Sequence, residues 1–270
     1  MIGEPHPVSL LFAIVLLFWH AANYLFSADP THNRHRPSLS RSSPRQLAWF
    51  VLRAAVAAIL TAAASGWGPG MLLAAAMFAG CIFLPAARWL WVPCRYLAEF
   101  ELAVNVGFAA LFQFLITHFN LKAPVSNPLL AAYTFAAAIL IFVVRGGTLI
   151  VRGVLDRAGT MPPPELTQPA SLFPPLPTDL QRALPVDTVE LNHGRLIGNI
   201  ERLILVLFVA NGQYTALAFF FAAKGLIRSK DVERRAWADY LILGSLTSFL
   251  VAVVAGLLIQ AVFHAAAGTR

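Results

Sequence analysis

The chain has 270 residues, of which 58% are hydrophobic and 12% are charged, and its mean hydropathy is +0.68. Soluble domains carry about 25% charged residues, because a surface in water must be solvated. The deficit excludes a soluble enzyme, a disordered tail, a collagen-like fibre and a disulfide scaffold. Long apolar runs separated by short charged segments instead predict an all-α, polytopic transmembrane helical bundle of about eight spans.

The net charge of +7 is carried mostly by arginines that flank apolar runs. This placement is typical of residues that fix the orientation of spans and attract anionic headgroups. We therefore expect the lipid bilayer as a partner, and no nucleic acid. Cys81 and Cys94 lack a C-x-x-C or Cys/His neighbour, so they predict neither a disulfide nor a metal framework.

Residues 1–158 predict an N-terminal membrane block of five spans. Each run is close to the roughly 20 apolar residues that cross a bilayer. A short amphipathic continuation, residues 148–155, is expected to lie at the membrane interface beyond Arg145-Gly146-Gly147. The five runs cover residues 8–26, 47–64, 71–87, 96–119 and 129–144.

The loops between these runs alternate in charge. Loop 66–70 has no charge and the fourth loop has Lys122 alone, whereas the first and third loops and the segment after the fifth run are rich in arginine. Basic loops stay in the cytoplasm, so we expect the N-terminus outside. The cytoplasmic arginines are then Arg34, Arg36, Arg41, Arg45, Arg88, Arg95, Arg145, Arg152 and Arg157.

Residues 159–193 differ in composition from both flanks, with eight prolines between Met161 and Pro185. Such density prevents a packed domain and predicts a cytoplasmic linker with polyproline character. A proline-rich motif that binds a partner is the alternative. The linker separates the five-span block from a C-terminal membrane block, residues 194–270, made of a helical hairpin and a final span.

The hairpin hypothesis rests on Asn211-Gly212, a strong turn dipeptide in the middle of an apolar stretch. The alternative for residues 195–229 is one long crossing, which would leave several basic residues outside, against the orientation rule. A hairpin places Glu201 and Lys224 at nearly the same depth on adjacent helices. Because a lone charge in the membrane is costly and a paired one less so, we expect these two residues to pair.

Other charges near this hairpin extend the predicted intramembrane network. Arg202 and Arg228 are expected to point towards the headgroups, and Asp239 enters the membrane from the same side as Lys224. The full predicted network is Glu201, Arg202, Lys224, Arg228 and Asp239. The final span, residues 237–263, also carries a ridge of small side chains that favours close helix packing: Gly244, Ser248, Ala252 and Gly256.

A set of short motifs extends over about fifty C-terminal residues, namely Gly194-Arg195, Ile197-Gly198, Glu201-Arg202, Gly212-Gln213, Ala223-Lys224, Arg228 and Asp239-Tyr240. These motifs resemble the signature of a widespread bacterial integral-membrane family of unknown function. In that family Glu usually precedes the Tyr, and Ser-x-x-Arg-Phe usually follows the Lys; this chain has Asp239, Gly225 and Ser229 instead. The resemblance implies a multi-pass protein of the bacterial inner membrane.

The N-terminal half of that family is similar to membrane-embedded metal-dependent hydrolases, with His-x-x-x-Asp and Asp-Gln-x-x-His motifs. Here His20 aligns, Tyr24 stands at the Asp position, and Glu101 and Asn105 fall at the Asp and His of the later motif. A hydrolytic metal needs about three protein ligands and an open position. His20, Glu99, Glu101 and Asn105 are the arguable ligands.

Simpler interpretations of the same residues are available. Arg53 and Glu101 are predicted at a similar depth, so a structural ion pair explains both charges without a metal. His20 is expected to be a core histidine bonded to its surroundings. We therefore expect no catalytic residues, no metal site and no cofactor.

Three function classes follow from the sequence. The favoured one is a non-catalytic scaffold or regulatory subunit that contacts a membrane-protein partner or forms a homo-oligomer. A transporter or channel for an ion or small anion could use Glu201, Lys224 and Asp239. A degenerate relative of membrane-bound metal-dependent hydrolases is the third.

Overall fold

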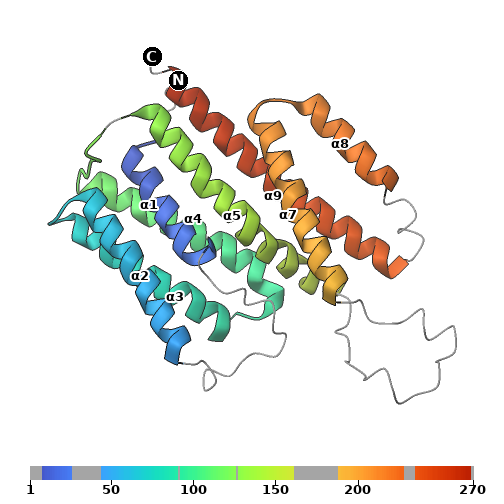
Figure 1. Ribbon diagram of the computed structural model, residues 1–270, viewed down its shortest axis with the longest axis horizontal. Helices are drawn as coiled ribbons and strands as arrows, with labels where there is room; N and C mark the ends of the chain where they lie inside the picture. The colour runs from blue at the N-terminus through green and yellow to red at the C-terminus, as the bar shows by residue number, and fades with distance from the viewer. Residues whose placement is uncertain are drawn as a thin grey trace.

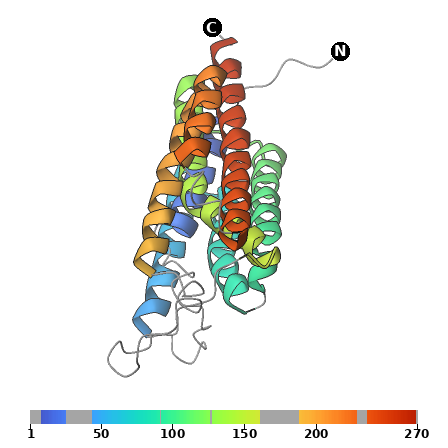
Figure 2. The same cartoon turned by 90° about the vertical axis from the view of Figure 1, so that its right-hand side faces the viewer.

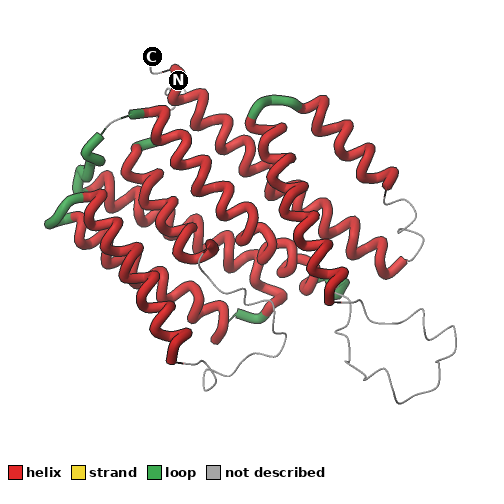
Figure 3. The backbone as a smooth tube through the Cα atoms, viewed as in Figure 1, coloured by secondary structure: helices red, strands yellow, loops and turns green. Residues whose placement is uncertain are grey.

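The computed structural model describes residues 8–25, 44–90, 92–125, 127–160, 188–227 and 235–268. Within these ranges the chain forms eight α-helices and no strand (Figures 1 and 3). The predicted all-α class is therefore confirmed. The eight prolines and Arg228 lie outside the described residues.

The N-terminal helices follow the predicted apolar runs. Ser9 caps the first helix by accepting a hydrogen bond from the Phe12 amide, and Asn127 caps the fifth in the same way ahead of Pro128. The elements are α1 (Leu10–His20), the π-helical turn η1 (Ala21–Leu25), α2 (Pro44–Ser65), α3 (Gly70–Leu90), the 3-10 turn η3 (Cys94–Tyr96), α4 (Leu97–His118) and α5 (Pro128–Arg157).

The C-terminal part forms three further helices, α7 (Thr188–Ala210), α8 (Tyr214–Ile227) and α9 (Arg235–Gly268). Gly212 has a φ of 69°, a left-handed conformation that glycine adopts without strain, and the chain reverses there. Residues 188–227 therefore form two helices rather than one long crossing. The end of the predicted linker, residues 188–193, is already helical.

Five helices are long and apolar enough to cross a membrane, which supports a multi-pass membrane protein. These candidate spans are Ala48–Ser65, Gly70–Arg88, Leu97–His118, Pro128–Arg157 and Asp239–Gly268. Two apolar helices are shorter, Leu10–Leu25 and Tyr214–Leu226.

The long helix α5 lies in the middle of the bundle and packs against α1, α4, α7 and α9, while α2 and α3 form one edge and α8 the other (Figure 1). Most of the helices run side by side along one direction (Figure 2). Residues from both predicted membrane blocks share one hydrophobic core, for example Trp19, Val143, Val206 and Ala252. The two predicted membrane blocks therefore pack against each other in a single helical bundle.

Residues 148–155, predicted as a short amphipathic continuation at the membrane interface, are part of α5 itself. Helix α5 continues without a break through Arg145-Gly146-Gly147 to Arg157. Leu149, Ile150 and Gly153 are buried, because this part of α5 packs against the start of α4. The two glycines do not end the helix; their small size admits neighbouring side chains.

The small-residue ridge of α9 packs inside the chain, against α5 and α7. Ser248 and Ala252 are buried, and Gly244 lies against Leu155. At Gly256 the approach is closest, since a β-carbon there would lie 2.6 Å from Val209 Cβ and 3.1 Å from a backbone oxygen of α7.

Gly256→Ala should therefore destabilise the protein by about 1–3 kcal/mol, because the added methyl group has no room against α7. Gly244→Ala is the matched control, since its β-carbon would make an ordinary contact at 3.6 Å and alanine favours the helix. Thermal unfolding in detergent measures both. Equal midpoints for the two variants would contradict the close approach at Gly256.

Candidate functional site

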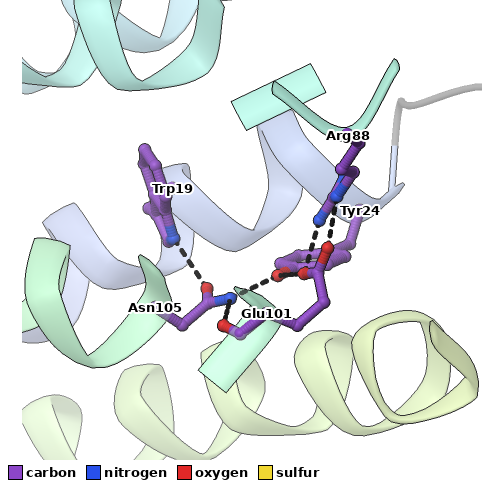
Figure 4. Close-up of polar contacts among 5 residues, drawn as sticks. All are labelled: Trp19, Tyr24, Arg88, Glu101 and Asn105. Atoms are coloured by element: carbon purple, nitrogen blue, oxygen red, sulfur yellow. Dashed lines mark hydrogen bonds and ion pairs between the residues drawn. The ribbon is translucent and has the colours of Figure 1, made fainter. Parts of the chain in front are cut away.

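Buried polar side chains gather at one end of the bundle, where α1, α3 and α5 finish and α4 begins. We call this the polar end. Its central group, the Tyr24 cluster, consists of Trp19, Tyr24, Arg88, Glu101 and Asn105 (Figure 4). All five side chains are at least nine-tenths buried. They come from α1, η1, α3 and α4, so the cluster connects segments far apart in the sequence.

An ion pair lies at the heart of the cluster. The Arg88 guanidinium holds both carboxylate oxygens of Glu101, with Nε on Oε1 and Nη2 2.6 Å from Oε2. Glu101 is fully buried, so this bidentate geometry supplies its counter-charge directly. The Tyr24 hydroxyl donates a third hydrogen bond to Oε2 at 2.7 Å, and the Tyr24 ring lies 5.0 Å from the guanidinium carbon.

Asn105 completes the cluster one helical turn after Glu101. Its Nδ2 donates to the Tyr24 hydroxyl at 2.5 Å and to the Glu101 carbonyl at 2.7 Å. Its Oδ1 accepts a hydrogen bond of 2.9 Å from Trp19 Nε1. The carboxylate, the hydroxyl and the amide are therefore all engaged with one another.

The π-helical turn η1 brings Asn23 and Tyr24 to this end of α1. Such turns are rare and occur often at functional sites. Asn23 Nδ2 donates to the Trp19 carbonyl at 3.0 Å and lies 3.6 Å from Cys81 Sγ. His20, one residue before the turn, is 3% exposed, and its Nδ1 donates to the Ala138 carbonyl at 2.8 Å. His20 thus binds backbone, as expected of a core histidine.

The structure brings three of the four arguable metal ligands, His20, Glu101 and Asn105, to the polar end. The fourth, Glu99, is exposed and pairs with Arg157. Within the described ranges no group of three or more His, Cys, Asp or Glu side chains could hold a metal ion. In the Tyr24 cluster the cation that neutralises Glu101 is a guanidinium.

The predicted ion pair between Arg53 and Glu101 is wrong. Arg88 takes both oxygens of Glu101, because it lies two residues before the end of α3 and Glu101 four residues after the start of α4, across the short η3 connection. Arg53 is also buried, at 5% exposure. Its three guanidinium nitrogens have no hydrogen-bond partner among the described residues.

At the hairpin, Lys224 Nζ lies 2.5 Å from Glu201 Oε2. The two side chains are 15% and 17% exposed, so the pair is largely shielded by the hairpin and its neighbours. Asp239 is exposed at the start of α9, and no ion pair joins it to Lys224 within the described part of the chain. The structure therefore brings together two members of the predicted network.

Arg202 does not point towards the headgroups, contrary to the prediction. It is 4% exposed and reaches from α7 into the bundle between α5 and α9. Its Nε donates to Ser248 Oγ at 3.0 Å, and its Nη1 to the Val143 carbonyl at 2.8 Å and to Thr148 Oγ1 at 3.3 Å. Neutral acceptors thus hold the charge inside.

From the sequence, Arg88 is predicted only as a charge of the third loop, and its role in the Tyr24 cluster is missed. Two signals in the sequence point to this cluster. His20 and Tyr24, and likewise Glu101 and Asn105, are four residues apart and so share a helix face. Arg88 precedes Glu101 across a short connection, so both lie at the same end of neighbouring helices.

Comparison with known protein families, with curated proteins and with solved structures gives no match to this chain.

Glu101→Gln should destabilise the protein by about 3–5 kcal/mol, because it leaves the buried Arg88 guanidinium without a counter-charge. Glu99→Gln, two residues earlier on the same helix, removes an exposed charge and should cost less than about 1 kcal/mol. Thermal unfolding in detergent measures the difference. Similar losses of stability for both variants would show that the buried ion pair contributes no more to stability than the exposed pair of Glu99 and Arg157.

Lys224→Ala should destabilise the hairpin by about 1–3 kcal/mol, a value between those of exposed and fully buried pairs, because it strands Glu201. The exposed Lys122→Ala serves as the matched control. The exchange Glu201→Lys with Lys224→Glu should recover much of the stability lost in Glu201→Lys alone, as followed by thermal unfolding. A double variant no better than the worse single variant would contradict the pairing.

Proposed function

We propose that this chain is a multi-pass protein of the bacterial inner membrane with a non-catalytic role, as a scaffold or regulatory subunit. One observation supports this most directly. The carboxylate, hydroxyl and amide of the Tyr24 cluster bind one another and Arg88, so they act as contacts between helices. A catalytic carboxylate or hydroxyl has to face a substrate instead.

In this proposal all eight described helices belong to the membrane domain. α1 runs from outside to inside and the direction alternates to α5, so the polar end faces the cytoplasm together with the arginine-rich loops. The α7–α8 hairpin enters and leaves on that side, and α9 ends outside. Residues 159–187 then form a cytoplasmic linker.

The proposed partner is a second membrane protein or another copy of this chain. The small-residue ridge of α9 packs against α5 and α7, so it is not the proposed contact surface. The proline-rich linker and the basic residues at the polar end remain as the surfaces for a partner. Proline-rich segments bind partners at low entropic cost because they are extended beforehand.

When the full chain is extracted in mild detergent, we expect it to elute as a complex. The protein mass of this complex should be well above the 29.3 kDa of one chain. Replacing the eight linker prolines by serine should release the partner without changing the unfolding temperature. Size-exclusion chromatography with light scattering and cross-linking mass spectrometry measure both.

Two results would contradict the scaffold. The first is charge-dependent flux in proteoliposomes that is lost in Glu201→Gln, which would indicate a transporter. The second is stoichiometric zinc or manganese in the purified protein, detected by elemental analysis, which would indicate a hydrolase.

A further inference from the structure

Arg53 is the one buried arginine of the described chain whose guanidinium nitrogens all lack a hydrogen-bond partner. The guanidinium lies over the Phe50 ring, 4.4 Å from its centroid, and in electrostatic range of Cys81 and Arg88. A cation–π contact with one phenylalanine does not replace the hydration of a full charge. The nearby Arg88 adds repulsion. The charge of Arg53 is therefore compensated neither by a carboxylate nor by neutral acceptors in the described residues.

A second unsatisfied group lies beside the same thiol. Asn23 Oδ1 is buried without a hydrogen-bond donor in the described residues, while Asn23 Nδ2 faces Cys81 Sγ at 3.6 Å. Asn23 on η1 contacts Cys81 of α3, and Arg53 on α2, a helix that packs against α3, interacts electrostatically with the same thiol. Arg53 offers hydrogen-bond donors and Asn23 Oδ1 offers an acceptor. Two complementary groups left open at one place point to a ligand that satisfies both.

The carboxylates that could neutralise Arg53 are engaged elsewhere. Glu101 is held by Arg88, and Glu99 by Arg157. Glu201 pairs with Lys224 on the α7–α8 hairpin, which packs on the opposite side of α5 from α2 (Figure 1). Each described acidic residue that could serve as a buried counter-charge therefore has its own partner.

We propose that Arg53 binds a phosphate group at the interface of α1, α2 and α3, with Asn23 accepting a hydrogen bond from the same ligand. A planar guanidinium matches two oxygens of a phosphate in a bidentate arrangement. Asn23 Oδ1 requires an O–H or N–H on the ligand. A protonated inorganic phosphate carries such a donor, and so does a phospholipid headgroup with a hydroxyl or an ammonium group.

The position of Arg53 along α2 is compatible with either source. Trp49, one turn earlier, is half exposed, as is typical of aromatic residues at a membrane interface. Val51, Leu52 and Val56 around Arg53 face outwards from the bundle. Because Arg53 points away from this outward face, a headgroup of the cytoplasmic leaflet would have to enter between α2 and its neighbours, and a free phosphate would enter from the polar end.

The test uses the full chain purified in a detergent without phosphate groups. Sodium phosphate should raise the unfolding temperature in a saturable way, compared with sodium chloride of equal ionic strength. Arg53→Met should weaken the apparent affinity about tenfold or more, since it removes charge-assisted hydrogen bonds. Arg95→Met, an exposed arginine at the same end, should leave the affinity unchanged.

A second arm distinguishes the two sources. Micelles containing phosphatidylglycerol replace inorganic phosphate, and native mass spectrometry counts the retained lipids. Stabilisation and one retained lipid that depend on Arg53, without an effect of inorganic phosphate, assign the site to the headgroup. Stabilisation by inorganic phosphate assigns it to the free anion. Arg53→Lys keeps the charge without the planar fork and should bind with intermediate affinity.

Two outcomes would overturn the proposal. In the first, phosphate and lipid stabilise the wild type and Arg53→Met equally, which would indicate general screening of the basic surface. In the second, Asp29→Asn abolishes the stabilisation as fully as Arg53→Met. Asp29 is the only acidic residue between positions 26 and 43. Its carboxylate would then be the missing counter-charge.

Discussion

The ion pair of the buried Glu101 carboxylate with Arg88 is the interaction on which the packing at the polar end of the bundle depends. A charge among apolar helices has to be neutralised at short range, because neither water nor lipid tails can do so. Arg88 supplies the charge from α3, and Tyr24 supplies a hydroxyl from η1. A shift of one residue moves a helix by 1.5 Å, which would break these bonds. The ion pair therefore sets the register of α1, α3 and α4.

Arg202 joins the other half of the bundle by a different solution. Its guanidinium donates to a backbone carbonyl of α5 and to two hydroxyls. The partial negative charges of these three oxygens compensate its positive charge in place of a carboxylate. The arrangement is favoured by a glycine, since a β-carbon at Gly147 would lie 2.6 Å from Arg202 Nη1 and the guanidinium would have to shift from its acceptors. From the sequence, Gly147 is expected to mark the end of a span. In the structure its missing side chain instead leaves room for the Arg202 guanidinium beside α5.

Apolar length and turn residues were enough to predict the helical class and the turn at Asn211-Gly212. Of the roughly eight predicted spans, five are helices long and apolar enough to cross a membrane within the described residues. Matching depths on a hairpin also placed Glu201 beside Lys224. These features depend on distance along the chain, which the sequence contains. The partners of Arg53, Arg88 and Arg202 depend on how helices rotate about their axes and on which helices are neighbours. Depth alone favoured Arg53 as the partner of Glu101 and did not bring Arg88 into consideration.

The three arginines that are buried in the described part of the chain differ in how their charge is compensated. Arg88 has a carboxylate, Arg202 has three neutral acceptors, and Arg53 has an aromatic ring and no hydrogen-bond acceptor in the described residues. Arg88 and Arg202 connect helices, so the free-energy cost of burying their charge is offset by the helix packing that they stabilise. Arg53 makes no hydrogen bond to any described residue, so it connects no helices in this way. A guanidinium kept inside the bundle without a structural bond is best explained by a ligand, and its fork geometry and the acceptor on Asn23 define the chemistry of that ligand.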